Sequence, residues 1–193
     1  MPRIKSFDEN EILEKAMFLF WEKGFYATSM QDLVTNLGIN RASIYDTYGD
    51  KMQLFLKAFA QYRKTSLNSL KTFLYSQNSV KEGFKKLFLS ITEESVSDKN
   101  KKGCFVVNTT TELTAHHEVI TSIIQENQKM FVDLFYDHLK TGVENGEISN
   151  KKDLRSLALF LFTLNNDIKV LNRTSGSSKE LKEMVLSALT ILD

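Results

Sequence analysis

The sequence predicts an all-α protein with about nine helices. Apolar residues recur at spacings of three and four along most of the chain, which is the periodicity of helices that bury one face. The 193 residues include a single proline, Pro2, and only eight glycines, so long helices can run without interruption while strands would lack turn signals to separate them. With 42% apolar and 25% charged residues, the composition is that of a folded globular protein.

The first predicted helix contains Ile12, Ala16 and Phe20 on one face. Ser6 and Glu9 have the spacing of a capping box at its start, and Gly24 marks its end.

Two short helices follow. Thr28 and Gln31 have capping-box spacing, and Gly38 stands where a helix terminus needs left-handed backbone geometry. Asn40 is a good cap for the next helix, which the Gly-Asp pair at residues 49–50 ends. Helices of about two turns are unstable alone, so the neighbouring helices must brace them as a helix-turn-helix.

Longer helices are predicted for the rest of the chain. Two of them have capping-box spacing at the start, Ser79 with Glu82 and Ser177 with Glu180. The predicted segments cover residues 55–74, 80–91, one that begins at 104, one from 119 to about 142 or 146, 153–172 and 179–192.

Composition excludes several classes of protein. No segment approaches the roughly 18 to 20 apolar residues of a membrane span, and the start of the chain lacks the apolar core of a secretory signal, so we expect a cytoplasmic protein. The only cysteine, Cys104, cannot form an internal disulfide or a multi-cysteine metal site. The net charge of +1 offers no support of its own for nucleic-acid binding.

The stretch from residue 12 to residue 55 carries a set of motifs in a fixed order: a first helix, then GFYATS, LVTNLGI and SIYDTYGDK. In these motifs the chain resembles the TetR family of one-component transcriptional regulators. The resemblance implies a helix-turn-helix DNA-binding domain at residues 1–52 and an effector-binding and dimerisation domain at residues 53–193. The second part resembles the family only in the number and length of its helices.

The second short helix is the expected recognition helix. Its first residues would face base edges, where Arg41 can donate two hydrogen bonds to guanine. The resemblance implies that Thr28, Tyr45 and Lys51 hold phosphates, and Thr47 stands where many relatives carry histidine. The full set of predicted DNA contacts is Thr28, Arg41, Ala42, Ser43, Tyr45, Thr47 and Lys51.

Alternatives exist for this surface. Arg41 could be a solvated charge at a helix start and Tyr45 a core residue, and Tyr48 fits the core better than a contact. Asp46 places a carboxylate close to a polyanion, and we expect it to turn sideways. Arg3 and Lys5 lie in an arm that either touches DNA or is merely solvated.

The segment GCFVVNTTTELTAHHE is the best candidate for an effector pocket, because polar residues are embedded in an apolar stretch. The predicted ligand-binding residues are Cys104, Phe105, Asn108, Thr109, Glu112 and His116. Alternatively, Asn108 and Thr109 only cap or bond a buried helix start. The adjacent histidines point about 100° apart on a helix and cannot easily share a metal ion, so no metal and no cofactor are expected.

Residues 157–164 are hydrophobic on every side, which predicts a helix covered both by its own subunit and by a second copy of the chain. The predicted dimer interface consists of Leu157, Phe160, Leu161, Leu164, Leu181, Met184, Val185 and Leu189. The alternative is the central core helix of a monomer.

These features predict a homodimeric DNA-binding regulator, most simply a repressor that a small-molecule effector releases from a palindromic operator on double-stranded DNA. No catalytic motif occurs in the sequence, so an enzyme is not expected. The alternative function is a small-molecule binding or sequestering protein with a vestigial helix-turn-helix, which Asp46 and the low net charge favour slightly.

Overall fold

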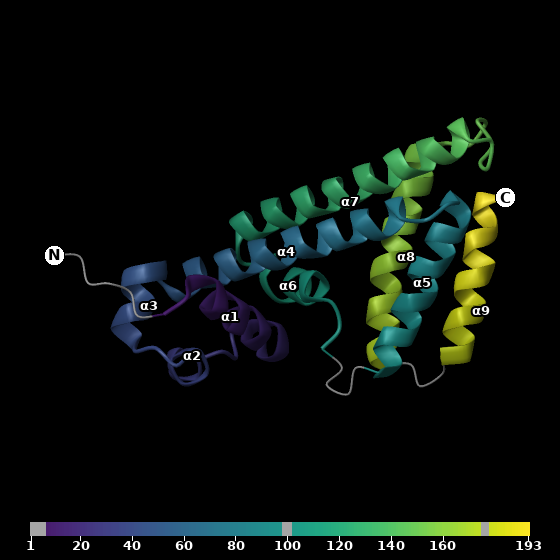
Figure 1. Cartoon of the computed structure of the whole chain (residues 1–193). Coiled ribbons are helices and arrows are strands. Elements are labelled where there is room, and N and C mark those ends of the chain that lie inside the picture. The colour runs from purple at the N-terminus through teal and green to yellow at the C-terminus, as the bar shows by residue number, and fades with distance from the viewer. Residues whose placement is uncertain (1–6, 98–101, 175–177) are drawn as a thin grey trace. The chain divides into compact units, whose positions relative to one another are not determined.

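The computed structural model describes residues 7–97, 102–174 and 178–193 (Figure 1). These residues form nine α-helices and one short 3₁₀ helix and contain no strand, which confirms the all-α prediction. The helices are α1 (Glu9–Lys23), α2 (Met30–Leu37), α3 (Arg41–Tyr48), α4 (Lys51–Tyr75), α5 (Val80–Ser97), α6 (Phe105–Leu113), α7 (Glu118–Glu144), α8 (Leu154–Thr174) and α9 (Ser178–Leu189), followed by the 3₁₀ turn Thr190–Leu192.

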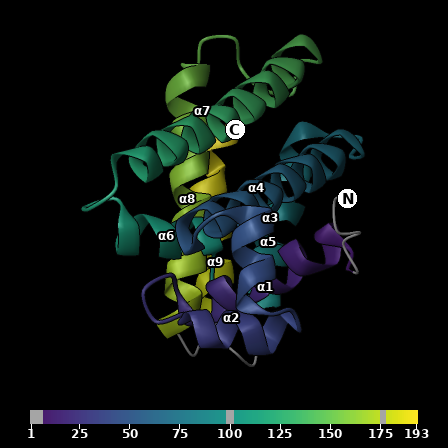
Figure 2. The same cartoon turned by 90° about the vertical axis from the view of Figure 1, so that its left-hand side faces the viewer.

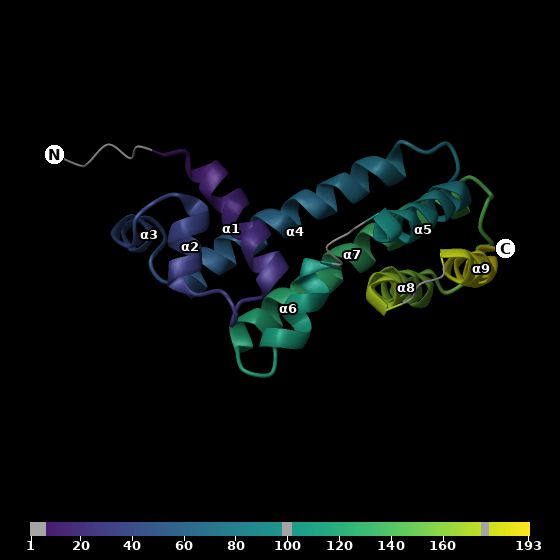
Figure 3. The same ribbon diagram turned by 90° about the horizontal axis from the view of Figure 1, so that it is seen from below.

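The chain forms two compact units, residues 1–66 and 67–193, and α4 contributes to both. In the first unit α2 lies between α1 and α3 (Figure 3). The rings of Phe20 and Phe25 both meet the ring of Phe55 edge-on at 5.2 Å between centroids. With the fully buried Leu33 and Ile44, these rings form the core that braces the two short helices.

The caps of the first unit differ in part from those expected. Asp8 caps α1 by accepting a hydrogen bond from the N–H of Asn10 at 2.8 Å, while Ser6 lies outside the described residues. The capping box of α2 consists of Ser29 and Asp32 rather than Thr28 and Gln31.

The turn between α2 and α3 agrees with the prediction. Gly38 has a φ of 69° in the left-handed region, and the side chain of Asn40 accepts a hydrogen bond from the N–H of Ser43 at 2.9 Å. Gly49 ends α3, and the carboxylate of Asp50 accepts from the N–H of Gln53 at 2.8 Å at the start of α4. Local caps therefore fix the length of both short helices.

In the second unit α5, α8 and α9 run side by side, and α7 crosses α8 obliquely (Figures 1 and 2). Ser79 accepts from the N–H of Glu82 at 3.3 Å, as its spacing predicted, and also donates to the Glu147 carboxylate at 2.6 Å. This second bond ties the loop after α7 to the start of α5. Ser177 lies outside the described residues.

The inner face of α8 packs into the core of its own chain, which does not support most of the predicted dimer-interface residues. Six of the eight are buried within the subunit, and Met184 is partly buried. The buried six are Leu157, Leu161, Leu164, Leu181, Val185 and Leu189. Only Phe160 is exposed, at 38% of its surface, together with Leu159, which the prediction omitted. No helix in the described part of the chain has the length and apolar character needed to cross a bilayer.

Candidate nucleic-acid interface

Helix α3 presents one face to solvent. Arg41, Ala42, Tyr45 and Asp46 are exposed, whereas Ile44 is fully buried. Because successive residues of an α-helix are about 100° apart, the exposed residues occupy one continuous side of α3. Arg41, Ala42 and Tyr45 are exposed, as expected. The alternative that Tyr45 is a core residue is wrong.

Arg41 and Tyr45 contact each other one helical turn apart. The guanidinium carbon of Arg41 lies 5.6 Å from the centroid of the Tyr45 ring, and its Nη2 donates to the Tyr45 hydroxyl at 3.3 Å. Since an arginine loses side-chain freedom when it binds, this contact orders the guanidinium in advance. Arg41 is therefore held at the N-terminal end of the exposed face.

The remaining residues of α3 are half-buried or buried. Ser43 and Thr47 are half-buried, and Tyr48 is buried, with its hydroxyl donating to the carbonyl of Glu9 at 3.3 Å. Burial, with the nearby carboxylates of Glu9 and Asp8, raises the pKa of Tyr48 to about 12. Tyr48 is a core residue, as its position predicted.

Thr28 has no exposed surface. Its hydroxyl donates to the carbonyl of Gly24 at 2.6 Å and thereby closes the turn that follows α1. This position does not support the prediction that the Thr28 hydroxyl holds a phosphate, because neither the hydroxyl nor its proton faces solvent.

Lys51 begins α4, with its ammonium 4.4 Å from the centroid of the Phe25 ring. A cation at a helix N-terminus opposes the helix dipole, so this position favours an anion nearby. Arg3 and Lys5 lie outside the described residues.

The predicted ligand-binding residues do not share one face. Phe105 and Thr109 are buried on the inner side of α6, and Cys104 is buried at its N-cap position. Asn108 donates to the carbonyl of Lys102 at 2.8 Å, which agrees with the capping alternative. His116 follows the end of α6 and is exposed, so it does not lie on the helix that carries Thr109.

Two buried polar groups of the second unit lack hydrogen-bond partners among the described residues. They are the hydroxyl of Thr109, in α6, and both ring nitrogens of His138, in α7. Other buried polar residues of this unit are Thr92, Asn127 and Asn165. Unpaired buried polar atoms are rare in folded proteins, so the Thr109 hydroxyl is a candidate anchor for a ligand.

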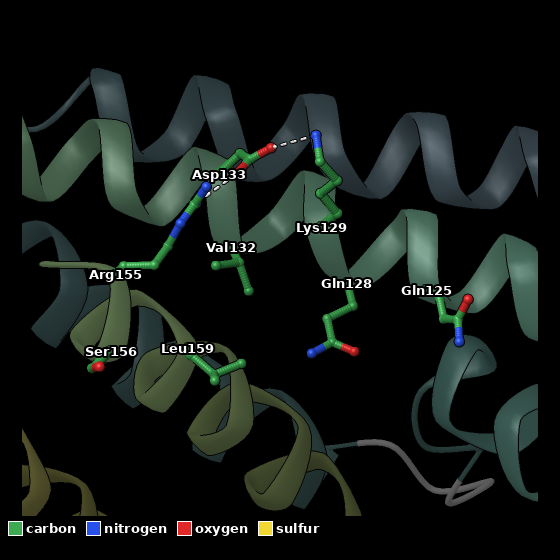
Figure 4. Close-up of a pocket in the computed structure, with 8 residues that line it drawn as sticks. All are labelled: Gln125, Gln128, Lys129, Val132, Asp133, Arg155, Ser156 and Leu159. Carbon is green, nitrogen blue, oxygen red and sulfur yellow. Dashed lines mark hydrogen bonds and ion pairs between the residues drawn. The ribbon is translucent and has the colours of Figure 1, made fainter.

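A groove of about 280 Å³ lies between α7 and α8 and was missed by sequence reasoning (Figure 4). None of the six predicted ligand residues lines it. Val132 and Leu159 supply its apolar surface, and Asp133 on its rim pairs with Arg155 at 2.6 Å and with Lys129 at 3.3 Å. Its residues come from the middle of one helix and the start of another, a proximity that no local motif indicates.

A braced helix-turn-helix with an exposed second helix, followed by a larger helical unit, defines a DNA-binding transcriptional regulator. Residues 12–58 match the model of the bacterial regulatory proteins of the tetR family, and residues 85–187 match that of the tetracyclin repressor-like C-terminal domain. The chain belongs to the TetR family. It is accordingly a transcriptional regulator and not an enzyme.

Relatives are similar to the whole chain. It is 30% identical to the uncharacterized HTH-type transcriptional regulator YezE of Bacillus subtilis strain 168, with 100% of each chain covered. It is 27% identical to the HTH-type transcriptional repressor ComR of Escherichia coli K12, over 98% of this chain and 90% of ComR. A solved structure of a cysteine mutant of the TetR family regulator CifR, complexed with 26-bp double-strand operator DNA, superposes with a TM-score of 0.87 at 25% identity, covering 99% of this chain and 100% of CifR.

Proposed function

We propose that the protein is a homodimeric repressor that binds a palindromic operator and leaves it when a small molecule binds the second unit. The exposed face of α3 carries this proposal, because a single helix with Arg41, Ala42 and Tyr45 outward fits the major groove. ComR, 27% identical, is named a repressor, and CifR is described as complexed with operator DNA.

The proposed division of roles follows from position. Arg41 and Ala42 contact base edges, with Ser43 at the margin, while Tyr45, Thr47 and Lys51 contact phosphates. Thr28 leaves this set, because its buried hydroxyl supports the turn after α1. An exposed α3 favours DNA binding over the alternative of a sequestering protein with a vestigial helix-turn-helix.

The proposed dimer forms through the outer surface of α8 and the C-terminal end of the chain. Large apolar side chains are exposed there: Leu159, Phe160, Val170, Leu171, Leu186 and Ile191. A monomer rarely exposes so many large apolar groups on neighbouring helices, and a second copy of the same surface would cover them. A two-fold dimer places two recognition helices in successive major grooves, about 34–36 Å apart or a multiple of that spacing, so the operator is palindromic.

The proposed effector binds among the helices of the second unit, where the unpaired Thr109 hydroxyl offers a hydrogen bond. The ligand favours a dimer whose recognition helices no longer match the two half-sites, and linkage requires that DNA weaken ligand binding by the same factor.

A gel-shift assay tests the regulatory function. It uses DNA flanking the encoding gene, a defined salt concentration and competitor DNA. We expect a discrete complex, and we expect a cell extract that contains the effector to dissociate it. With Thr109→Val, the same extract should dissociate less of the complex. A complex equally strong on unrelated DNA contradicts the proposal.

Sedimentation analysis tests the dimer. We expect a dimer for the unaltered chain, a monomer for Phe160→Glu, and a dimer for the control Met130→Glu, which changes an exposed apolar residue of α7. A monomeric unaltered chain at micromolar concentration contradicts this part of the proposal.

A further inference from the structure

Asp46 lies on the side of α3 that enters the major groove in the proposed complex. Asp46 and Tyr45 stand on either side of Ala42, each about 100° or less from it around the helix, and the fully buried Ile44 lies opposite. The expectation that Asp46 turns sideways is therefore not supported. Its carboxylate occupies the exposed face together with Tyr45.

Nothing in the fold explains a carboxylate at this position. No hydrogen bond or ion pair joins Asp46 to any residue whose side chain the structure describes, in 7–93, 102–171 or 179–193, and the one cation of α3, Arg41, is engaged by Tyr45. Asp46 is in the last turn of α3, where the helix dipole disfavours a negative charge. The charge also repels DNA phosphates and so lowers general affinity for DNA.

A carboxylate is an acceptor without a donor, which restricts the base edges that it can meet. In the major groove guanine presents N7 and O6, and thymine presents O4, all of them acceptors that repel a carboxylate. Adenine offers its N6 amino group beside the acceptor N7. Cytosine offers its N4 amino group and has no acceptor of its own on the major-groove edge, and a carboxylate is the usual partner of that group.

We propose that Asp46 recognises one cytosine in each half-site and excludes other bases at that position by electrostatic repulsion. This inference rests on the proposed function, since it requires α3 in the major groove. The unpaired charge then contributes to specificity at the expense of general affinity, because the N4 amino group of cytosine relieves the repulsion and the acceptors of the other bases add to it.

Selection from a pool of duplexes with 30 random base pairs, followed by sequencing, tests the proposal and identifies the preferred operator in the same experiment. The full-length chain is compared with Asp46→Ala, Asp46→Asn and the control Glu144→Ala, which removes an exposed carboxylate of the second unit with the same change in net charge. Circular dichroism checks that the variants are folded.

We expect the unaltered chain and Glu144→Ala to enrich the same palindrome, with one cytosine in each half-site. Asp46→Ala should no longer require that cytosine, and its preference for cytosine at that position should fall by about fivefold or more. Asp46→Asn should move the preference at that position toward adenine, whose N6 and N7 match a carboxamide. An unchanged palindrome for both Asp46 variants, or a uniform gain in affinity for all sequences, overturns the role of Asp46. Absence of any enriched sequence for the unaltered chain overturns the proposed function itself.

Discussion

The ammonium of Lys23, at the end of α1, lies 2.7 Å from the carboxylate of Asp32 in the first turn of α2. The same carboxylate accepts hydrogen bonds from the backbone N–H of Ser29 at 2.8 Å and from its hydroxyl at 2.7 Å. These contacts hold the pKa of Asp32 well below its usual value. The hydrogen bond from Lys23 has the largest effect, and the two hydrogen bonds from Ser29 come next. One side chain therefore joins the end of α1 to the N-cap of α2.

Asp32→Asn should lower the midpoint of thermal unfolding at pH 7, because it removes the ion pair and weakens the capping box. The pKa of Asp32 is depressed in the folded state, so its contribution is complete above the unfolded value of about 3.8 and is lost as pH falls below it. The difference between the unaltered chain and the variant should therefore shrink at pH 2 to 3. Circular dichroism melts at several pH values measure it, with Glu22→Gln as the control, and a difference independent of pH contradicts the assignment.

Thr28→Val should destabilise the chain by about 1 kcal/mol, since it removes the buried hydrogen bond to Gly24. It should leave the salt dependence of DNA binding unchanged, because the number of phosphate contacts stays the same. Urea unfolding and binding titrations at several salt concentrations measure the two effects. A salt slope reduced by about one ion would restore Thr28 as a phosphate contact.

Local signals in the sequence predicted the helix-turn-helix well. Gly38 and Asn40 mark the turn through backbone geometry and capping, which depend on the residue itself and its near neighbours. The start of α2 was misplaced by one residue, because Thr28 and Ser29 each have a polar partner three residues later. Lys23, from another helix, supports the Ser29 and Asp32 pair, and spacing within α2 alone does not reveal that contact.

Contacts between distant helices were beyond the sequence. Periodicity showed that α8 is apolar on both sides, but the same pattern fits either Leu161 or Leu159 facing the core. Leu161 is fully buried and Leu159 is 45% exposed, which only the packing of α8 on α5 and α7 decides. The burial of His138 was not predicted for the same reason, since it depends on helices that are distant in the chain.

Arg41→Ala and Lys51→Ala should have different effects on DNA binding. The first should weaken operator binding by about 1–3 kcal/mol and relax the preference at one base pair, because it removes a contact to base edges. The second should weaken binding to all sequences and reduce the salt slope by about one ion, because it removes a phosphate contact. Titrations of operator and random DNA at several salt concentrations distinguish them. Equal losses on both DNAs for both variants would contradict the division of roles.

His138 should make the stability of the chain depend on pH below about 6.5. The side chain is 3% exposed between the rings of Tyr75 and Phe84, each 5.4 Å away between centroids. Burial lowers its pKa below the usual 6.5, against the opposing effect of the Glu147 carboxylate. The unfolded chain then binds a proton that the folded chain does not, so stability is complete above pH 6.5 and falls as pH decreases.

Urea unfolding between pH 5 and 7.5 measures this dependence. His138→Leu should remove most of the slope, whereas His116→Gln, which changes an exposed histidine, should leave it unchanged. Parallel slopes for the unaltered chain and His138→Leu would show that His138 does not titrate as its burial predicts.

Hydroxyl-radical footprinting of the full-length chain on DNA flanking its encoding gene tests most directly whether two copies of α3 enter one duplex. We expect two protected segments related by two-fold symmetry, with centres about 10 base pairs or a multiple of that apart, and Arg41→Ala should need a higher protein concentration to protect both. Protection that is uniform along the DNA and disappears as salt rises would contradict the pair of recognition helices.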